Sequence, residues 1–152
     1  MQHVKGTLIP IGGNEDKGFE DDEIHRLDYI EEGILAHVVE EAGGIDAKII
    51  VIPTASSIPI EVGKNYLTAF ATLGCKNVTV LDIRTQADSE KADFIQHIKT
   101  ADCIMFSGGD QSKISKYIGG SAIHTVLLER YKNDAGFVIA GTSAGAMMMA
   151  EE

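Results

Sequence analysis

Five short apolar runs, each followed by a longer polar or amphipathic stretch, constrain this chain most strongly. The runs occupy residues 7–11, 48–52, 78–81, 103–106 and 137–140. Their regular alternation with segments of helical periodicity is typical of βαβ units. Because the chain has 152 residues and contains neither repeats nor a linker, we predict one domain over residues 1–152. We expect an α/β fold with an open, doubly wound, mostly parallel sheet.

Helical segments are predicted between these runs, several of them ending at glycine. The predicted helices cover residues 30–42, 61–73, 88–99, 112–118 and 121–132, and another begins after residue 145. Ligands of such folds bind at the carboxyl ends of the strands. Three glycine-containing loops fall there, at residues 12–13, 108–109 and 141–145. These loops are therefore the first places to look for a functional site.

Composition and charge exclude several classes of function. The chain carries 23 acidic and 13 basic residues, a formal charge of −10, and no basic cluster, so we do not expect a nucleic-acid partner. No apolar run approaches the roughly 18 residues of a membrane span, and the first residues do not resemble a signal peptide. Cys75 and Cys103 form no CxxC motif. We expect both thiols to be reduced, in a cytoplasmic protein.

Cofactor and metal motifs are not found in the sequence. The segment from Gly12 to Lys17 (GGNEDK) is neither a dinucleotide fingerprint nor a P-loop. Asp21, Asp22, Glu23 and His25 could meet a cation, but acidic residues also favour a solvated helix start. We therefore predict no cofactor and no metal site.

The sharpest chemical feature is the segment from Gly141 to Gly145 (GTSAG). It follows an apolar run and precedes a helical segment, which is the context of a nucleophile elbow. In such a turn the Ser143 hydroxyl projects from the tip, and the N–H of Ala144 faces a developing oxyanion. The alternative interpretation is a turn of small residues packed tightly under the sheet. GxSxG alone is a weak signal, and its position between strand and helix strengthens it.

A second glycine loop, residues 107–111 (SGGDQ), follows the fourth apolar run. Its glycines allow positive φ and a close approach of backbone to ligand. Gly108 or Gly109 could supply a second oxyanion donor, with Asp110 and Gln111 at the rim of the pocket. The alternative is a plain turn from strand to helix, with Asp110 or Ser112 as the N-cap.

Four loop motifs, taken together, resemble the cyanophycinase-like serine exopeptidases, a family that also contains aspartyl dipeptidases. They are GGNEDK at residues 12–17, PTAS at 53–56, FSGGDQ at 106–111 and GTSAGA at 141–146, in register along the chain. The resemblance implies a fold similar to flavodoxin and class I glutamine amidotransferases. It also implies hydrolysis of cyanophycin, a polyaspartate that carries arginine on its side chains, into β-Asp-Arg units.

The resemblance assigns roles residue by residue. Ser143 corresponds to the nucleophile, and the backbone N–H groups of Gly109 and Ala144 correspond to the oxyanion hole. The substrate contacts fall on Gly108, Asp110, Gln111 and Thr142. On charge alone, and not from the resemblance, the acidic loop from Glu15 to Asp22 is a further candidate contact for the arginine groups of an aspartyl- and arginyl-rich peptide. The oxyanion donor in the second glycine loop is thus Gly109 by resemblance, whereas the spacing alone leaves Gly108 open.

One family feature is missing from the sequence. The general-base histidine of the family lies downstream of the serine, whereas all five histidines here lie upstream of Ser143. The chain therefore resembles the N-terminal portion of a longer family domain, with a sheet incomplete at its C-terminal side. Truncation is the first explanation; the alternatives are a cleaved second piece that completes the fold and self-association as a homo-oligomer through the exposed edge and face. The alternatives to a cyanophycinase are an aspartyl dipeptidase on the same scaffold and a catalytically inactive fragment or binding module.

Overall fold

A computed structural model describes residues 4–11 and 31–141 of the chain. The strands are β1 (Thr7–Pro10), β2 (Ile49–Ile52), β3 (Val78–Val80), β4 (Cys103–Phe106) and β5 (Val138–Gly141). The helices are η1 (Glu31–Leu35), α2 (Ala36–Ala42), α3 (Pro59–Thr72), η2 (Ala87–Glu90), α4 (Ala92–Thr100), α5 (Gln111–Tyr117) and α6 (Ala122–Asn133). The strands lie where the apolar runs predict them, to within about one residue at each end.

All five strands form one parallel sheet in the order β1-β5-β4-β2-β3. Every residue of β2, β4 and β5 is buried, as expected of central strands that are covered on both faces. The edge strands β1 and β3 are only half-buried apart from Pro10, which is exposed. The expected α/β architecture with an open parallel sheet is confirmed.

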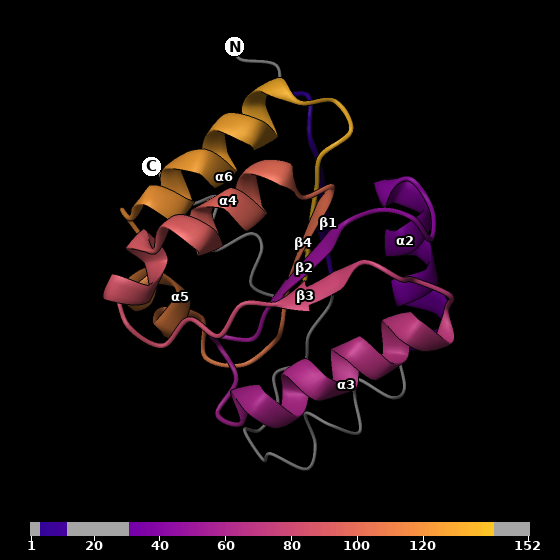
Figure 1. Ribbon diagram of the computed structural model, residues 1–152, viewed down its shortest axis with the longest axis horizontal. Coiled ribbons are helices and arrows are strands. Elements are labelled where there is room, and N and C mark those ends of the chain that lie inside the picture. Colours follow the sequence, from indigo (N-terminus) through magenta and orange to yellow (C-terminus); the bar gives the residue numbers. More distant parts are fainter. Residues whose placement is uncertain (1–3, 12–30, 142–152) are drawn as a thin grey trace.

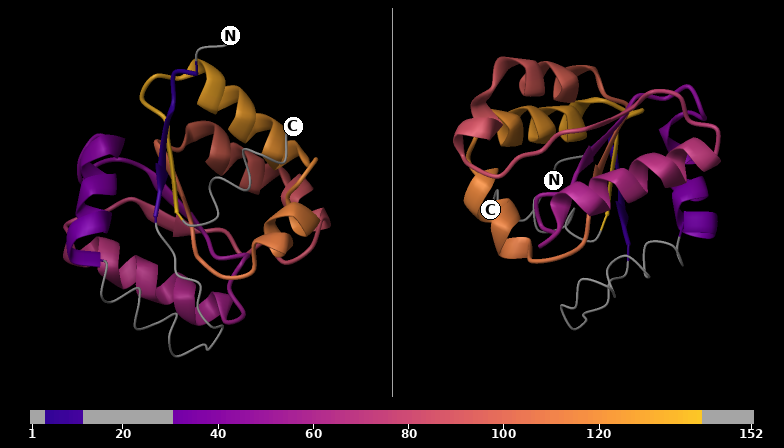
Figure 2. Two further views of the ribbon diagram at one scale, coloured as in Figure 1. Left: turned by 180° about the vertical axis from the view of Figure 1, so that it is seen from behind. Right: turned by 60° about the horizontal axis from the view of Figure 1, so that its bottom comes forward.

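Helices cover both faces of the sheet (Figures 1 and 2). Because side chains of a strand alternate between the faces, Ile49 and Val51 pack in the core on the α2 and α3 side. Ile50 and Ile52 pack in the second core, on the side of α4, α5 and α6. The strictly apolar strands therefore serve two cores at once. None of the helices in residues 4–11 and 31–141 is both long and apolar enough to cross a membrane.

The edge strand β1 pairs with β5 through alternate residues. The N–H of Thr7 donates to Phe137 O (2.8 Å), and the N–H of Ile11 donates to Gly141 O (3.4 Å). In a parallel pair every second residue, here Leu8 and Pro10, directs its backbone groups away from the partner. Pro10 has no N–H, so it fits this strand without leaving a β5 carbonyl unpaired.

Two predicted helices differ in detail from the structure. The segment predicted as one helix over residues 88–99 is split into η2, a 3₁₀ turn, and α4, because Lys91 between them is extended at ψ 132°. Hydrogen bonds to residues far along the chain stabilise the 3₁₀ turn and the break that follows it. The hydroxyl of Ser89 donates to Tyr117 O (2.8 Å), and a carboxylate oxygen of Glu90 accepts from the N–H of Ala122 (3.1 Å). The helix predicted over residues 30–42 begins with a π-helical turn, η1, before it becomes α-helical.

Candidate functional site

The carboxyl ends of β2, β4 and β5 lie next to one another at one edge of the sheet. Ile52 is paired with Phe106, and Phe106 is paired with Gly141. The loops that follow these strands therefore start side by side. Two of them are the FSGGDQ segment and the entry to GTSAG, which lie 35 residues apart in sequence (141 − 106) and are brought together by the β4–β5 pairing.

Gly141 ends β5 in a backbone conformation that suits glycine. Its φ is +123°, and a Cβ atom there would lie 2.0 Å from the carbonyl oxygen of Phe106. Any side chain would force the two strands apart at this point. The first glycine of the motif is thus required for the close strand contact. Thr142, Ser143 and Ala144 lie outside the described residues, so their predicted roles stay predictions.

The loop after β4 contains a second glycine in a special conformation. Gly109 has a φ of +134° and is exposed, and Gly108 is half-buried. Within residues 4–11 and 31–141, neither glycine N–H donates a hydrogen bond to the backbone. An N–H group without a backbone partner suits the oxyanion role predicted for Gly109. The prediction itself concerns Ser143 as well and stays a prediction.

Asp110 and Gln111 start α5. A carboxylate oxygen of Asp110 accepts from the backbone N–H of Ser112 (2.9 Å) and from the Ser112 hydroxyl (2.7 Å). These bonds lower the pKa of the Asp110 carboxyl, since the Ser112 hydroxyl and then its N–H stabilise the ionised form. Asp110 is thus the N-cap that the sequence suggested as one alternative. Both Asp110 and Gln111 are exposed at the rim of this edge.

Sequence reasoning assigned no role to the segment Pro53–Ser56, which follows β2. The structure places it beside the glycine loop, because the N–H of Asp110 donates to Ala55 O (2.8 Å). A Cβ atom on Gly109 would lie 2.2 Å from the same oxygen. The contact is made by backbone atoms, which explains why the PTAS motif marked the segment without indicating what it does. This segment is a further part of the candidate site.

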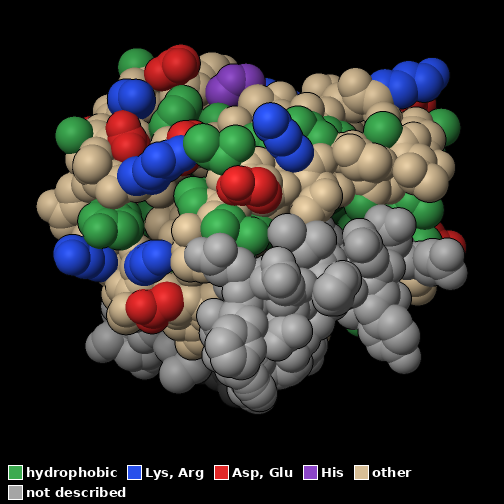
Figure 3. Space-filling view, turned by 90° about the horizontal axis from the view of Figure 1, so that it is seen from below, with side chains coloured by type: hydrophobic (Ala, Val, Ile, Leu, Met, Phe, Trp, Pro, Cys, Tyr) green, Lys and Arg blue, Asp and Glu red, His purple; other side chains and the backbone are tan. Residues whose placement is uncertain are grey.

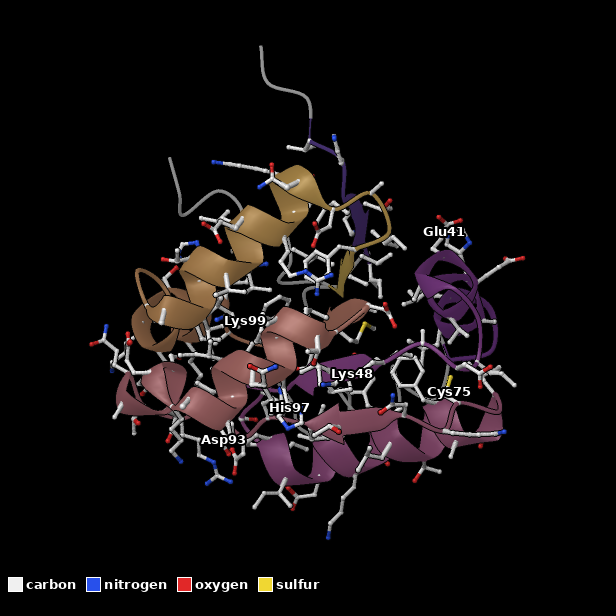
Figure 4. The ribbon with its side chains drawn as sticks, turned by 45° about the horizontal axis from the view of Figure 1, so that its top comes forward. Glu41, Lys48, Cys75, Asp93, His97 and Lys99 are labelled. Atoms are coloured by element: carbon white, nitrogen blue, oxygen red, sulfur yellow. The ribbon has the colours of Figure 1, made fainter. Side chains whose placement is uncertain are left out.

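The described histidines do not look like a general base. His124 is buried on α6, and its Nδ1 accepts from the N–H of Gly120 (2.8 Å), which leaves the proton of a neutral ring on Nε2. His97 lies with Asp93 on one side of α4, opposite Lys99 (Figure 4). His97 Nδ1 is buried and has no hydrogen-bond partner in the described part of the chain. His37 is exposed on α2, and His3 and His25 lie outside the described residues.

The described residues do not gather into a metal site. No group of three or more His, Cys, Asp or Glu residues among residues 4–11 and 31–141 could hold an ion. The candidate acids Asp21, Asp22 and Glu23 and the loop from Glu15 lie outside this part. Viewed from the side on which α3 lies, the described surface shows Lys and Arg side chains interspersed with Asp and Glu (Figure 3).

Both cysteines are free, as expected of reduced thiols, and both are buried. Burial raises the pKa of the Cys75 thiol, and it raises that of Cys103 on β4 much further. A thiol that stays protonated is a poor nucleophile. The cysteines therefore offer no alternative to a hydroxyl nucleophile.

Comparison with known proteins places these features in a family. Residues 23–152 match the model of peptidase family S51. A cyanophycinase from Geminocystis herdmanii is 32% identical over 151 residues, which cover 97% of this chain and 50% of the relative. A cyanophycinase from Synechococcus elongatus is 32% identical over 150 residues, covering 97% of this chain and 42% of the relative. The chain thus spans about half the length of the curated relatives it matches.

Solved structures agree with this assignment. A peptidase from an acI-B1 Actinobacterium has a TM-score of 0.68 and 25% identity, with 97% of this chain and 57% of that one covered. A putative peptidase E protein from Listeria monocytogenes has a TM-score of 0.56 and 25% identity, with 77% of this chain and 56% of that one covered. The α/β fold of this chain is thus found in peptidases of known structure. Together with the match over residues 23–152, this shows that the chain belongs to peptidase family S51, a family of serine peptidases.

Proposed function

We propose that this chain carries the nucleophile portion of a serine exopeptidase that releases β-Asp-Arg units from cyanophycin or a related aspartyl peptide. The observation that carries the proposal is the pairing of Phe106 with Gly141. This pairing puts the start of the GTSAG segment beside the loop that holds Gly109. The 32% identity to two cyanophycinases supports the choice of substrate class.

In the proposed reaction the Ser143 hydroxyl attacks the scissile amide carbonyl. A histidine accepts the serine proton and later protonates the leaving amine. The N–H groups of Gly109 and Ala144 stabilise the oxyanion of the tetrahedral intermediate. Gly108, Asp110, Gln111 and Thr142 contact the peptide. The base in this proposal is none of the described histidines: His124 Nδ1 accepts from the N–H of Gly120, and His37 and His97 lie on α2 and α4.

The proposal is tested by intact-mass spectrometry after treatment with a fluorophosphonate. An activated Ser143 takes one adduct per 16.3 kDa chain, and Ser143→Ala takes none. Ser115→Ala is the matched control, since Ser115 is exposed on the nearby helix α5, and it keeps the adduct. The absence of any adduct on the wild-type chain would contradict an activated serine and favour the inactive fragment or binding module.

The substrate is tested with cyanophycin and with matched dipeptides that differ only in the linkage of aspartate. We expect hydrolysis of cyanophycin to β-Asp-Arg, with a loss of several orders of magnitude in rate for Ser143→Ala. Hydrolysis of α-linked aspartyl dipeptides alone would overturn the cyanophycin assignment and identify an aspartyl dipeptidase. Equal rates for the wild type and Ser143→Ala would rule out Ser143 as the nucleophile.

A further inference from the structure

The segment Pro53–Ser56 is buried although it is a loop between β2 and α3. Thr54, Ala55 and Ser56 are 5%, 1% and 2% exposed. Connecting loops usually run over the surface, because buried backbone groups need partners. A loop that is buried at every residue is held by specific bonds, and those bonds lead to the candidate site.

Thr54 anchors this segment from one side. Its hydroxyl donates to Ile83 O (2.8 Å), in the stretch that follows the edge strand β3. Within the segment, the N–H of Ser56 donates to Pro53 O (3.0 Å), and the Ser56 hydroxyl oxygen accepts from the N–H of Ile58 (2.9 Å). The turn is therefore closed on itself and tied to the β3 side of the sheet by one buried side chain.

Ala55 connects this anchored segment to the glycine loop through its backbone carbonyl. Its carbonyl oxygen accepts from the N–H of Asp110 (2.8 Å) and would lie 2.2 Å from a Cβ atom on Gly109. The peptide between Gly109 and Asp110 is thus held against a single oxygen atom. Since the N–H of Gly109 is one peptide unit away, its direction depends on where that oxygen lies.

We propose that Thr54 is a positioning residue of this site. Its hydroxyl fixes the Ala55 carbonyl, and the Ala55 carbonyl fixes the N–H of Gly109 toward the oxyanion. This inference rests on the proposed function, in which Gly109 is an oxyanion donor. Loss of one oxyanion donor costs about 10²- to 10³-fold in kcat. Removal of the Thr54 hydroxyl would misdirect the N–H of Gly109 and not remove it, so we expect a smaller fall in kcat, of about 10- to 100-fold.

Thr54→Val tests the inference, since valine keeps the shape of threonine and lacks the hydroxyl. Thr54→Ser restores the donor. Ser89→Ala is the matched control, because Ser89 is fully buried and its hydroxyl also donates to a carbonyl at 2.8 Å, that of Tyr117 at the far end of α5. For Thr54→Val we expect a lower kcat with a KM within about twofold of wild type. For Thr54→Ser we expect kcat to return toward the wild-type value, and for Ser89→Ala we expect an unchanged kcat. A kcat within about twofold of wild type in Thr54→Val, or an equal loss in Ser89→Ala, would overturn the inference.

Amide hydrogen exchange tests the positioning role of Thr54 without an activity measurement. In Thr54→Val the N–H of Asp110 should exchange about tenfold faster than in Ser89→Ala, relative to the globally exchanging amides of each variant. Equal protection of Asp110 in both variants would overturn the positioning role. A wild-type chain that hydrolyses nothing would contradict the proposed function, whereas the exchange of Asp110 would still show whether Thr54 positions this loop.

Discussion

The guanidinium carbon of Arg130 lies 4.2 Å from the centroid of the Phe137 ring. The same side chain pairs with Asp134 (2.6 Å) and donates to the carbonyl oxygens of Ile98 (3.2 Å) and Ala101 at the end of α4. One arginine thus joins α6, α4 and the residue before β5. Its planar fork satisfies two carbonyls that the helix end leaves without partners.

Replacement of this arginine should destabilise the fold. Arg130→Met is expected to lower the free energy of unfolding by about 2–3 kcal/mol, because two carbonyls lose their donor. Arg130→Lys should recover less than half of this, since an ammonium group cannot donate in two fixed directions. Urea titration measures both. Lys132→Met, at an exposed position of the same helix, should stay within about 0.5 kcal/mol of wild type.

Gly141→Ala should be among the most damaging glycine substitutions in the described fold. The positive φ and the approach to Phe106 O together are expected to cost more than about 2 kcal/mol of unfolding free energy. Gly136→Ala is the control, since nothing lies within 4 Å of the point that its added methyl group would occupy, and its φ is ordinary. Equal stability of the two variants in urea would contradict the tight β4–β5 contact.

The Asp110 cap predicts a pH dependence with a definite sign. Because the folded-state pKa of Asp110 lies below its ordinary value of 3.8, the ionised carboxylate stabilises the fold. This contribution is fully present above the ordinary value and is lost as the pH falls through the folded-state pKa. Asp110→Ala should lower the free energy of unfolding measurably at pH 7, because the N-cap is lost. The gap between wild type and Asp110→Ala in unfolding free energy should narrow below pH 3.8; a constant gap would contradict the assigned cap.

The two thiols should be protected in the native protein and differ in rate. Cys103 is fully buried and Cys75 is 8% exposed, and both pKa values are raised by burial. We expect slow modification by iodoacetamide at about pH 7.5, with Cys75 reacting first, and two rapid adducts in denaturant. Peptide mapping by mass spectrometry gives the order. Faster reaction at Cys103 would contradict the packing of β4.

The strands could be located from the sequence because each is a short apolar run that must be buried on one or both faces. The bounds of β4 were predicted to the residue. Tyr66 and Phe70 pack on one face of α3, with ring centroids 6.3 Å apart, because residues four positions apart on a helix are neighbours. The break at Lys91 could not be predicted in the same way. It depends on bonds from Ser89 and Glu90 to residues about 30 positions away, which local periodicity does not contain.

The candidate site was predicted in part for a similar reason. Glycine at positions 109 and 141 marks backbone conformations that the residue type itself indicates, and both have positive φ. The neighbour that makes Gly109 necessary is the carbonyl oxygen of Ala55. Every residue type has a backbone carbonyl, so the residue types give no sign of this contact. The position of the Ala55 carbonyl follows from the order of the strands in the sheet. The place of β2 next to β4 had to come from the structure.

Pro10 gives the β1 edge of the sheet a polarity of its own. Of the backbone groups that β1 turns away from β5, the only amide hydrogen within Thr7–Pro10 belongs to Leu8, since proline has none. Along Thr7–Pro10 an incoming strand would find two acceptors, the carbonyl oxygens of Leu8 and Pro10, and one donor. This edge is thus a weaker template for the addition of another strand than an edge with a donor at every second residue.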